Sequence, residues 1–227
     1  MKFKHVLLIA FLVITIDQIL KIYIKTHFEL DQSQALIGNW AKFHFAENPG
    51  MAWSLKIAGP TGKLFLTLFR LGAVIFGVFY LKRLIAQRYT KGFLICASLI
   101  WAGAIGNLLD SMFYGLIFDT GMLYDKASSD YYNYQGISQF TTFGTGYTKL
   151  FMGNVVDMFY FPLFDIPLGN GKKIEFFNAI FNIADAAISV GVLTIIFFQK
   201  KLYRRYEIDI KSTLQTKEVI SDENQVS

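Results

Sequence analysis

The sequence predicts an all-α membrane protein: four transmembrane helices, a small extracytoplasmic β-element and an inserted outer loop. The first observation is composition, because 53% of the 227 residues are hydrophobic and 17% are charged, against roughly 25% charged residues in soluble domains. The second is a mean hydropathy of +0.38. The third is the presence of four apolar runs that are each long enough to cross a bilayer, which takes roughly 20 residues.

The four apolar runs are predicted to be helices, because backbone polar groups in lipid must be satisfied within their own segment. They cover about residues 6–24, 64–81, 92–112 and 176–199, within one membrane domain over 1–206. The first run has the basic start of a cleaved signal peptide. No small-x-small site follows it, however, and it continues through Asp17 and Gln18, so we expect it to be retained.

Basic residues set the predicted orientation. They precede the first run, fill the turn between the second and third, and follow the fourth: Lys2, Lys4, Lys82, Arg83, Arg88, Lys91, Lys200, Lys201, Arg204 and Arg205. Positive residues favour the cytoplasmic side, so both termini are predicted to be cytoplasmic in a multi-pass protein. The net charge of +5 is therefore assigned to membrane orientation and not to nucleic-acid binding. The polar tail 207–227 is predicted to be disordered.

The two longer loops, 25–63 and 113–175, fall on the other side of the membrane. In the first, alternation over 42–45 before turn residues Asn48-Pro49-Gly50 predicts a short strand or hairpin. The second contains an insert over about 119–153 that is rich in Tyr, Ser, Thr and Gly. An apolar, strand-like segment around Asp157 follows the insert.

Polar residues inside the apolar runs mark a candidate site, because charges in lipid are rare and expensive. They are Asp17, Gln18, Lys21, Arg70, Asn107, Asp110, Asn178, Asn182 and Asp185. At 1.5 Å per residue, Asp17 is expected ~10 Å inside Ile24, and Asp185 ~13 Å inside Phe176. All of them fall in the outer half of the bilayer, which predicts one site near the outer surface. A transporter or channel, the alternative function, should carry polar groups in both halves and paired broken helices.

Spacing refines the roles of these residues. Asp17 and Lys21 are four residues apart and can form an ion pair. The spacing of Asn178, Asn182 and Asp185 puts them on one helix face. Asn178 is interpreted as an interhelical hydrogen-bonding residue. Arg70 is interpreted as an anchor whose charge reaches the interface.

Asp185 has no basic residue in its own run and therefore needs a partner. Asp157 is the candidate partner. Two neighbouring carboxylates do not easily both ionise, so one keeps a proton while the other stays charged. The charged member can take a proton from water, and the neutral member can donate one to a scissile carbonyl or leaving nitrogen. Such a pair can hydrolyse a peptide bond by general acid–base catalysis, without a metal or other cofactor.

The sequence does not contain the residue patterns that other mechanisms of peptide hydrolysis require. Cys96 is the single cysteine, and the three histidines are scattered with no H-E-x-x-H spacing, so no metal site is predicted. The chain contains neither a G-x-S-G nor a G-x-G-D motif. A Ser–Lys dyad would need a serine near Lys21; Ser54 and Ser111 are conceivable by depth, but no motif supports either.

Five ordered motifs resemble those of the lipoprotein signal peptidases (signal peptidase II), the bacterial aspartic membrane proteases. They are Asp17-Gln18-Ile19-Leu20-Lys21, Asn48-Pro49-Gly50-Met51-Ala52-Trp53-Ser54, Gly103-Ala104-Ile105-Gly106-Asn107-Leu108-Leu109-Asp110, Val155-Val156-Asp157 and Phe181-Asn182-Ile183-Ala184-Asp185. Each motif alone is weak, but five in order over most of residues 10–200 are a specific signal.

The resemblance implies a membrane aspartic endopeptidase with Asp157 and Asp185 as catalytic residues. It implies supporting or substrate-binding roles for Asp17, Lys21, Asn48, Gly50, Asn107, Asp110 and Asn182. The substrate would be a prolipoprotein whose cysteine carries diacylglycerol, cut just before that cysteine. The resemblance further implies sensitivity to globomycin-type antibiotics. We expect a monomer in the bacterial cytoplasmic (inner) membrane, in contact with membrane lipids, with its active site near the extracytoplasmic face.

Two features depart from the family pattern. Ser111 stands where the family usually has Arg directly after the Asp of the third motif, and Arg70 is a possible substitute. The insert 119–153 separates the third motif from Val155-Val156-Asp157, so Asp119 sits where the catalytic Asp would fall without an insert. We assign the role to Asp157, which keeps both valines and lies closer to the last apolar run.

Overall fold

The computed structural model describes residues 1–38, 40–50, 59–162, 164–169, 172–176 and 179–203. Three sequence predictions fall outside these residues: the Met51–Ser54 part of the first-loop motif, the interhelical role of Asn178 and the tail 207–227.

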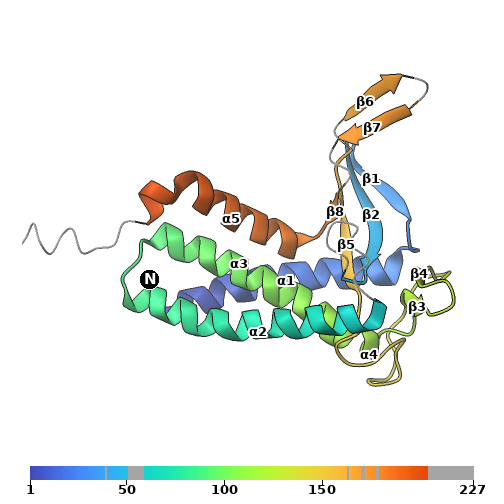
Figure 1. Ribbon diagram of the computed structural model, residues 1–227, viewed down its shortest axis with the longest axis horizontal. Coiled ribbons are helices and arrows are strands. Elements are labelled where there is room, and N and C mark those ends of the chain that lie inside the picture. Colours follow the sequence, from blue (N-terminus) through green and yellow to red (C-terminus); the bar gives the residue numbers. More distant parts are fainter. Residues whose placement is uncertain (39, 51–58, 163, 170–171, 177–178, 204–227) are drawn as a thin grey trace, which may run out of the picture.

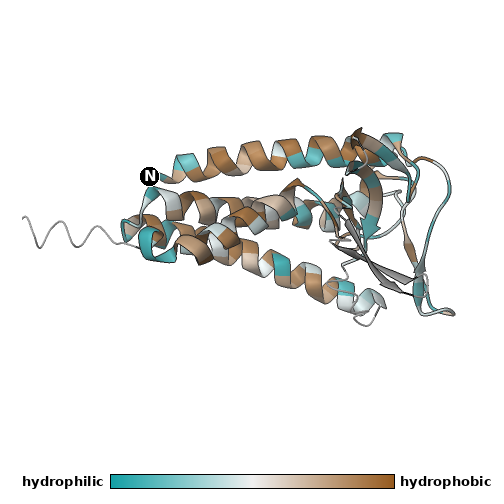
Figure 2. Cartoon of the chain, turned by 90° about the horizontal axis from the view of Figure 1, so that it is seen from above, coloured by the Kyte–Doolittle hydropathy of each residue, from teal (hydrophilic) through white to brown (hydrophobic). Residues whose placement is uncertain are grey.

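Four helices form the long axis of the molecule (Figure 1): α1 (Phe3–His27), α2 (Gly59–Ala86), α3 (Lys91–Leu109) and α5 (Ile183–Leu202). Helix α3 contacts each of the other three. It continues through a π-helical turn, η1 (Asp110–Tyr114), into the short α4 (Gly115–Ile117). All four helical segments are long and apolar enough to cross a membrane. Most of their residues are hydrophobic, and hydrophilic residues are more frequent toward the helix ends (Figure 2).

Local sequence explains where the helices begin. Pro60 lies in the first turn of α2, where its missing N–H removes no helical hydrogen bond. At α3, the hydroxyl of Thr90 accepts a hydrogen bond from the Phe93 N–H at 3.3 Å. At α5, the Asn182 side chain caps the first turn by accepting from the Asp185 N–H at 2.9 Å.

The fourth helix begins later than predicted. Residues 172–176 and 180–181 form strands, so α5 starts at Ile183 and not at about residue 176. Asp185 therefore lies in the first turn of α5 and not ~13 Å inside a helix. Likewise, Asn182 is the residue that caps this helix and is not a member of one helical face. An apolar run can be strand or helix, and hydropathy alone does not separate the two.

A four-stranded antiparallel sheet covers one end of the helices (Figure 1), and it is the small β-element that the sequence predicts. Its order is β1 (Ser33–Ile37), β2 (Ala41–Asn48), β5 (Val155–Tyr160) and β8 (Ile180–Phe181). Strands β2 and β5 place Ala46 opposite Asp157, next to an irregularity of the register between Phe43 and Ala46. The sheet thus brings the strand that follows the insert next to the start of α5.

A buried apolar cluster fixes this sheet to the end of α1. It contains Ile24 of α1 and Phe28 directly after α1, together with Phe45, Val156 and Met158 of the two central strands. Because Val156 and Met158 flank Asp157 on either side, their burial holds the backbone at Asp157 in place.

The segment 119–153 folds against the same end of the bundle. It contains the hairpin β3 (Leu123–Asp125) and β4 (Asp130–Tyr132), and Phe140 bridges back to Phe118. A separate hairpin, β6 (Phe164–Gly169) and β7 (Lys172–Phe176), projects beyond the sheet (Figure 1).

Candidate active site

The centre of the candidate site is a buried ion cluster. The Lys21 ammonium lies 2.8 Å from Asp17 and 2.7 Å from Asp110, and all three side chains are fully buried. The structure therefore contains the ion pair that the Asp17–Lys21 spacing predicts and adds Asp110 to it. A single buried ammonium between two carboxylates joins α1 to the end of α3.

Asn107 links this cluster to Asp185. Its side-chain oxygen accepts a hydrogen bond from Lys21 at 2.9 Å, and its Nδ2 donates to Asp185 Oδ1 at 2.7 Å. Because a lysine ammonium only donates hydrogen bonds, Lys21 fixes which way the Asn107 amide points. The amide hydrogens of Asn107 are thereby directed at the Asp185 carboxylate.

Asn182 holds Asp157 in the same way. Its oxygen is occupied by the backbone N–H of Asp185, and its Nδ2 donates to Asp157 Oδ1 at 2.6 Å. The same Nδ2 lies 3.1 Å from the Asn107 oxygen, so the two amides are linked directly. The structure thus brings Asp157 and Asp185, 28 positions apart in sequence, into one hydrogen-bonded group.

The two carboxyl groups have different surroundings. Asp157 is 5% exposed, whereas Asp185 is half-buried in the first turn of α5. Burial, reinforced by the negative charge of Asp185, raises the pKa of Asp157 to about 8. At neutral pH, Asp157 therefore holds a proton, and it does so next to the second carboxyl group, that of Asp185. The pair can both donate and accept a proton, as acid–base hydrolysis requires.

Gln18 and Tyr114 extend the network. The sequence places Gln18 among the polar residues that mark the site but assigns it no specific role, and it does not indicate Tyr114. Gln18 Nε2 donates to Asp110 Oδ1 at 2.7 Å, and the Tyr114 hydroxyl donates to the Gln18 oxygen at 3.1 Å. The position of Gln18 directly after Asp17 in the first motif could have indicated its role in the network. Tyr114 ends the π-helical turn, a feature that often marks functional sites and that no sequence pattern here indicates. Asp17 itself also accepts a hydrogen bond from the Ala184 N–H at 2.9 Å, which positions the start of α5.

Arg70 contacts the residue that departs from the family pattern. Its guanidinium lies 3.4 Å from the Ser111 hydroxyl. It also interacts electrostatically with Asp185, Asp110 and Asp157. The positive charge of Arg70 on α2 therefore acts through space on these three carboxylates.

Asn48 and Gly50 lie where the first loop leaves β2. The Gly50 N–H donates to Asn48 Oδ1 at 2.9 Å, and Gly50 has a φ of +98°, which favours glycine. Asn48 pairs with Val155, two positions before Asp157. Both residues are near the strand that carries Asp157.

Asp119 has a different setting. It is exposed, and its Oδ1 accepts hydrogen bonds from the Gln139 N–H at 2.8 Å and the Ser138 hydroxyl at 3.1 Å. Although burial acts in the opposite direction, these hydrogen bonds lower the pKa of Asp119. Its hydrogen bonds to described residues all remain within the segment 119–153, so its contacts are those of a loop-stabilising carboxylate. Over the described ranges, no group of three or more His, Cys, Asp or Glu side chains is arranged to hold a metal ion.

Comparison with known proteins decides the family. Residues 9–200 match the family described as signal peptidase (SPase) II. The chain belongs to the signal peptidase II family. The resemblance drawn from the five motifs is thereby confirmed, and membership makes the protein a bacterial membrane peptidase.

Relatives in this family support the assignment over most of the chain. A lipoprotein signal peptidase of Porphyromonas gingivalis is 40% identical over 200 residues, covering 85% of this chain and 81% of the relative. One from Chlorobaculum tepidum is 30% identical, covering 87% and 95% respectively. A solved bacterial membrane enzyme, 24% identical, superposes with a TM-score of 0.52 over 87% of this chain and 88% of its own, which shows a shared fold.

Proposed function

We propose that this signal peptidase II is an aspartic endopeptidase that removes the signal peptide from diacylglyceryl-modified prolipoproteins, cutting before the lipidated cysteine. The observation that carries the proposal is the hydrogen-bonded group that joins Asp157 and Asp185 through Asn182 and Asn107. The related lipoprotein signal peptidases support the substrate class.

The geometry supports a division of roles within the pair. Asp157 holds the proton at neutral pH, because burial and the charge of Asp185 raise its pKa to about 8. Asp185 takes a proton from a water molecule as the water oxygen attacks the scissile carbonyl carbon. Asp157 gives its proton to the carbonyl oxygen, which forms a gem-diol. As the C–N bond breaks, Asp185 passes the proton it took from water to the leaving nitrogen, and Asp157 takes a proton back from a gem-diol hydroxyl. No covalent enzyme intermediate is needed.

The remaining polar residues position this pair. Lys21, Asp17 and Asp110 form a buried ion cluster. This cluster orients Asn107, which donates a hydrogen bond to Asp185. Buried charges that are paired and fully hydrogen-bonded hold their geometry, because breaking one contact leaves another charge uncompensated. We assign these residues to positioning, and the direct chemistry to the two aspartates.

We propose that the sheet end of the molecule, with its carboxylates, faces the extracytoplasmic side of the inner membrane. The support is the placement of basic residues at the opposite ends of the helices. A lipid-modified precursor held in the outer leaflet would then present its cleavage site at the depth of the pair.

The proposed substrate and cleavage position are tested with purified protein and two precursors. One precursor carries diacylglyceryl on its cysteine, and the other carries an unmodified serine at that position. Mass spectrometry of the products should show a new N-terminus at the lipidated cysteine in the first case and no cleavage in the second. Equal cleavage of the serine precursor, or a cut elsewhere, would contradict the proposal.

Arg70 is proposed to supply the positive charge that the family Arg would provide at Ser111. Arg70→Ala should reduce processing, and Arg70→Lys should retain more activity because the positive charge remains. Normal processing by well-inserted Arg70→Ala protein would remove this role.

A further inference from the structure

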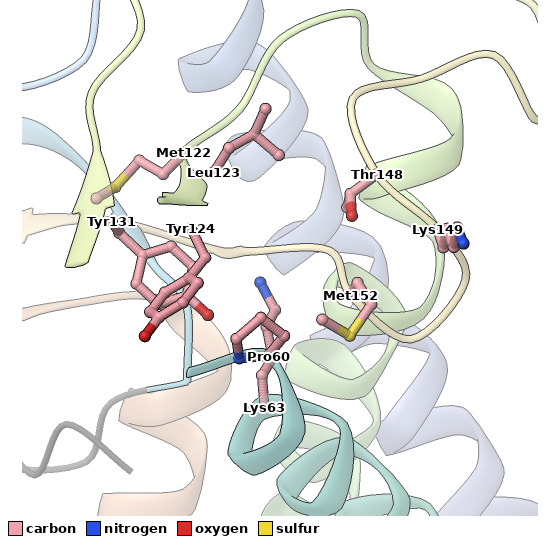
Figure 3. A pocket seen from close by; sticks show the side chains of 9 residues that line it. All are labelled: Pro60, Lys63, Met122, Leu123, Tyr124, Tyr131, Thr148, Lys149 and Met152. Atoms are coloured by element: carbon pink, nitrogen blue, oxygen red, sulfur yellow. The ribbon is translucent and has the colours of Figure 1, made fainter. Parts of the chain in front are cut away.

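A cavity lies at the end of α2 that adjoins the sheet, beside the segment 119–153. Its volume is about 250 Å³. Lys63 of α2 forms its floor, and the inserted segment supplies Met122, Tyr124, Tyr131, Lys149 and Met152 (Figure 3). Neither catalytic aspartate lines it. The cavity is therefore built mainly by the insert, which has no role in the proposed chemistry.

Lys63 places a buried amino group, which can carry a positive charge, in this cavity. The residue is 6% exposed, and Figure 3 shows its ammonium pointing between the tyrosines and Met152. Its ammonium donates a hydrogen bond to the neutral Asn154 side chain and lies 5.7 Å from the centre of the Tyr131 ring. A lysine ammonium has three donors, so Asn154 does not exhaust it.

The neighbouring carboxylate does not balance this charge. Glu47 acts electrostatically on Lys63, but it forms an ion pair with the buried Lys25. Glu47 Oε2 also accepts hydrogen bonds from Asn154 at 2.7 Å and from the Met122 N–H at 2.9 Å. Within the part of the chain that the structure describes, Lys63 has no carboxylate at ion-pair distance. The charged form of a buried amino group is unfavourable without a counter-charge, so an anion that enters the cavity would stabilise the lysine ammonium and be stabilised by it.

The lining indicates what kind of anion fits. Methionine side chains and tyrosine rings surround the ammonium, so the ligand should carry apolar or weakly polar groups next to its charge. The cavity lies at the end of a predicted membrane span, the level at which phospholipid headgroups and tyrosines meet. Lysine is a frequent phosphate-binding side chain. The exposed Lys149 also lines the cavity, with its side chain directed away from Lys63 (Figure 3).

We propose that this cavity binds the phosphate group of an anionic phospholipid, with Lys63 as the principal contact. The inserted segment would then serve as a lipid-binding element at the outer membrane surface. The proposal is independent of the peptidase mechanism, because it uses none of the residues around Asp157 and Asp185.

The test uses the full-length protein in nanodiscs. One set contains phosphatidylcholine alone, and a second contains an increasing fraction of phosphatidylglycerol. Thermal unfolding gives Tm, and native mass spectrometry after release from the discs counts the lipids retained. A ligand that binds only the folded protein raises Tm, so phosphatidylglycerol should raise Tm, whereas inorganic phosphate added to phosphatidylcholine discs should not.

Two variants disable the cavity in different ways, and a third variant serves as the control. Lys63→Met removes the charge, and Met152→Trp fills the space while leaving Lys63 in place. Both should lose the Tm rise and bind phosphatidylglycerol about ten- to a hundred-fold more weakly, as expected for one charge-assisted hydrogen bond. Lys82→Met, an exposed lysine at the other end of α2, should behave like the native protein.

Three results would overturn the proposal. The first is a native-like response to phosphatidylglycerol in Lys63→Met. The second is loss of the response in Lys82→Met to the same degree, which would indicate general charge attraction. The third is an equal Tm rise with inorganic phosphate, which would make the ligand a free anion and not a lipid.

Discussion

At the scale of single residues, the site depends on the direction of two side-chain amides. Lys21 and the Asp185 N–H can only donate hydrogen bonds, so each occupies the oxygen of one asparagine. The amide hydrogens of Asn107 and Asn182 are then left to meet Asp185 and Asp157, the two proposed catalytic residues. Lys21 and the Asp185 N–H therefore set the orientation of the two asparagine amides, and these amides position both carboxylates.

The raised pKa of Asp157 predicts a pH dependence of stability. The folded protein keeps the Asp157 proton up to about pH 8, while an unfolded carboxyl releases it near 3.8. Stability from this group is therefore fully present below about pH 4 and is lost as pH rises toward 8, by at most ~1.4 kcal/mol per pH unit. Asp157→Asn should have a flatter Tm profile between pH 5 and 9. An unchanged slope would show that another group is responsible.

Substitution of Asn182 separates its two roles. Asn182→Ala loses both the helix cap and the hydrogen bond to Asp157, and a lost cap costs about 0.5–2 kcal/mol. Asn182→Ser restores the cap, because serine caps helices as well as asparagine does, but it lacks the amide donor. We expect serine to recover thermal stability and not kcat. Recovery of both would mean that Asn182 acts only as a cap.

At the scale of elements, a buried polar network fixes the inserted segment to the helices. The Lys25 ammonium pairs with Glu47 and donates to the Thr120 carbonyl at 3.0 Å. It also lies over four aromatic rings, those of Phe45, Phe118, Tyr134 and Tyr147. Glu47 holds the insert through Met122 and Tyr134. This network connects α1, β2 and the insert, which lie far apart in the sequence but are in contact in the folded protein.

Removing the charge of Glu47 should release the insert. Glu47→Gln leaves Lys25 buried without its counter-charge, and breaking a buried ion pair costs about 3–5 kcal/mol. Limited proteolysis should then cut faster within 119–153. The double variant Lys25→Met/Glu47→Gln removes both charges and should regain part of the lost stability. Equal rates of proteolysis in the native protein, the single variant and the double variant would refute this role of the network.

Close packing of α3 against α5 gives a second element-scale prediction. A Cβ on Gly103 would collide with the backbone oxygen of Ala184 and would lie 2.7 Å from Ile188, so Gly103→Ala should push the helices apart. Overpacking of this kind costs about 1–3 kcal/mol. The matched control is Gly72→Ala on α2, where no atom lies within 4 Å. The control should keep or slightly raise Tm, and an equal loss in both variants would contradict the packing argument.

At the scale of the whole molecule, hydropathy and spacing predict the four helices and the Asp17–Lys21 pair, because both depend on local sequence. The start of α5 could not be placed by hydropathy, because residues 176–181 are mostly apolar. A mostly apolar run is compatible with a strand as well as with a helix. The Asn182–Asp185 cap was a local signal that could have corrected it. The π-helical turn, the Lys25–Glu47 network and the cavity at Lys63 depend on contacts across the insert, which local patterns do not encode.

The central claim is that Asp157 and Asp185 together carry out the hydrolysis, and cleavage by single aspartate variants tests it most directly. Cleavage of a diacylglyceryl-modified precursor is measured for Asp157→Asn, Asp185→Asn and the control Asp119→Asn, each shown to be inserted and folded. The rate should fall about 10²–10⁴-fold in the first two variants and stay native-like in Asp119→Asn. Near-native cleavage by Asp157→Asn or Asp185→Asn, or loss of cleavage in Asp119→Asn, would contradict the assignment.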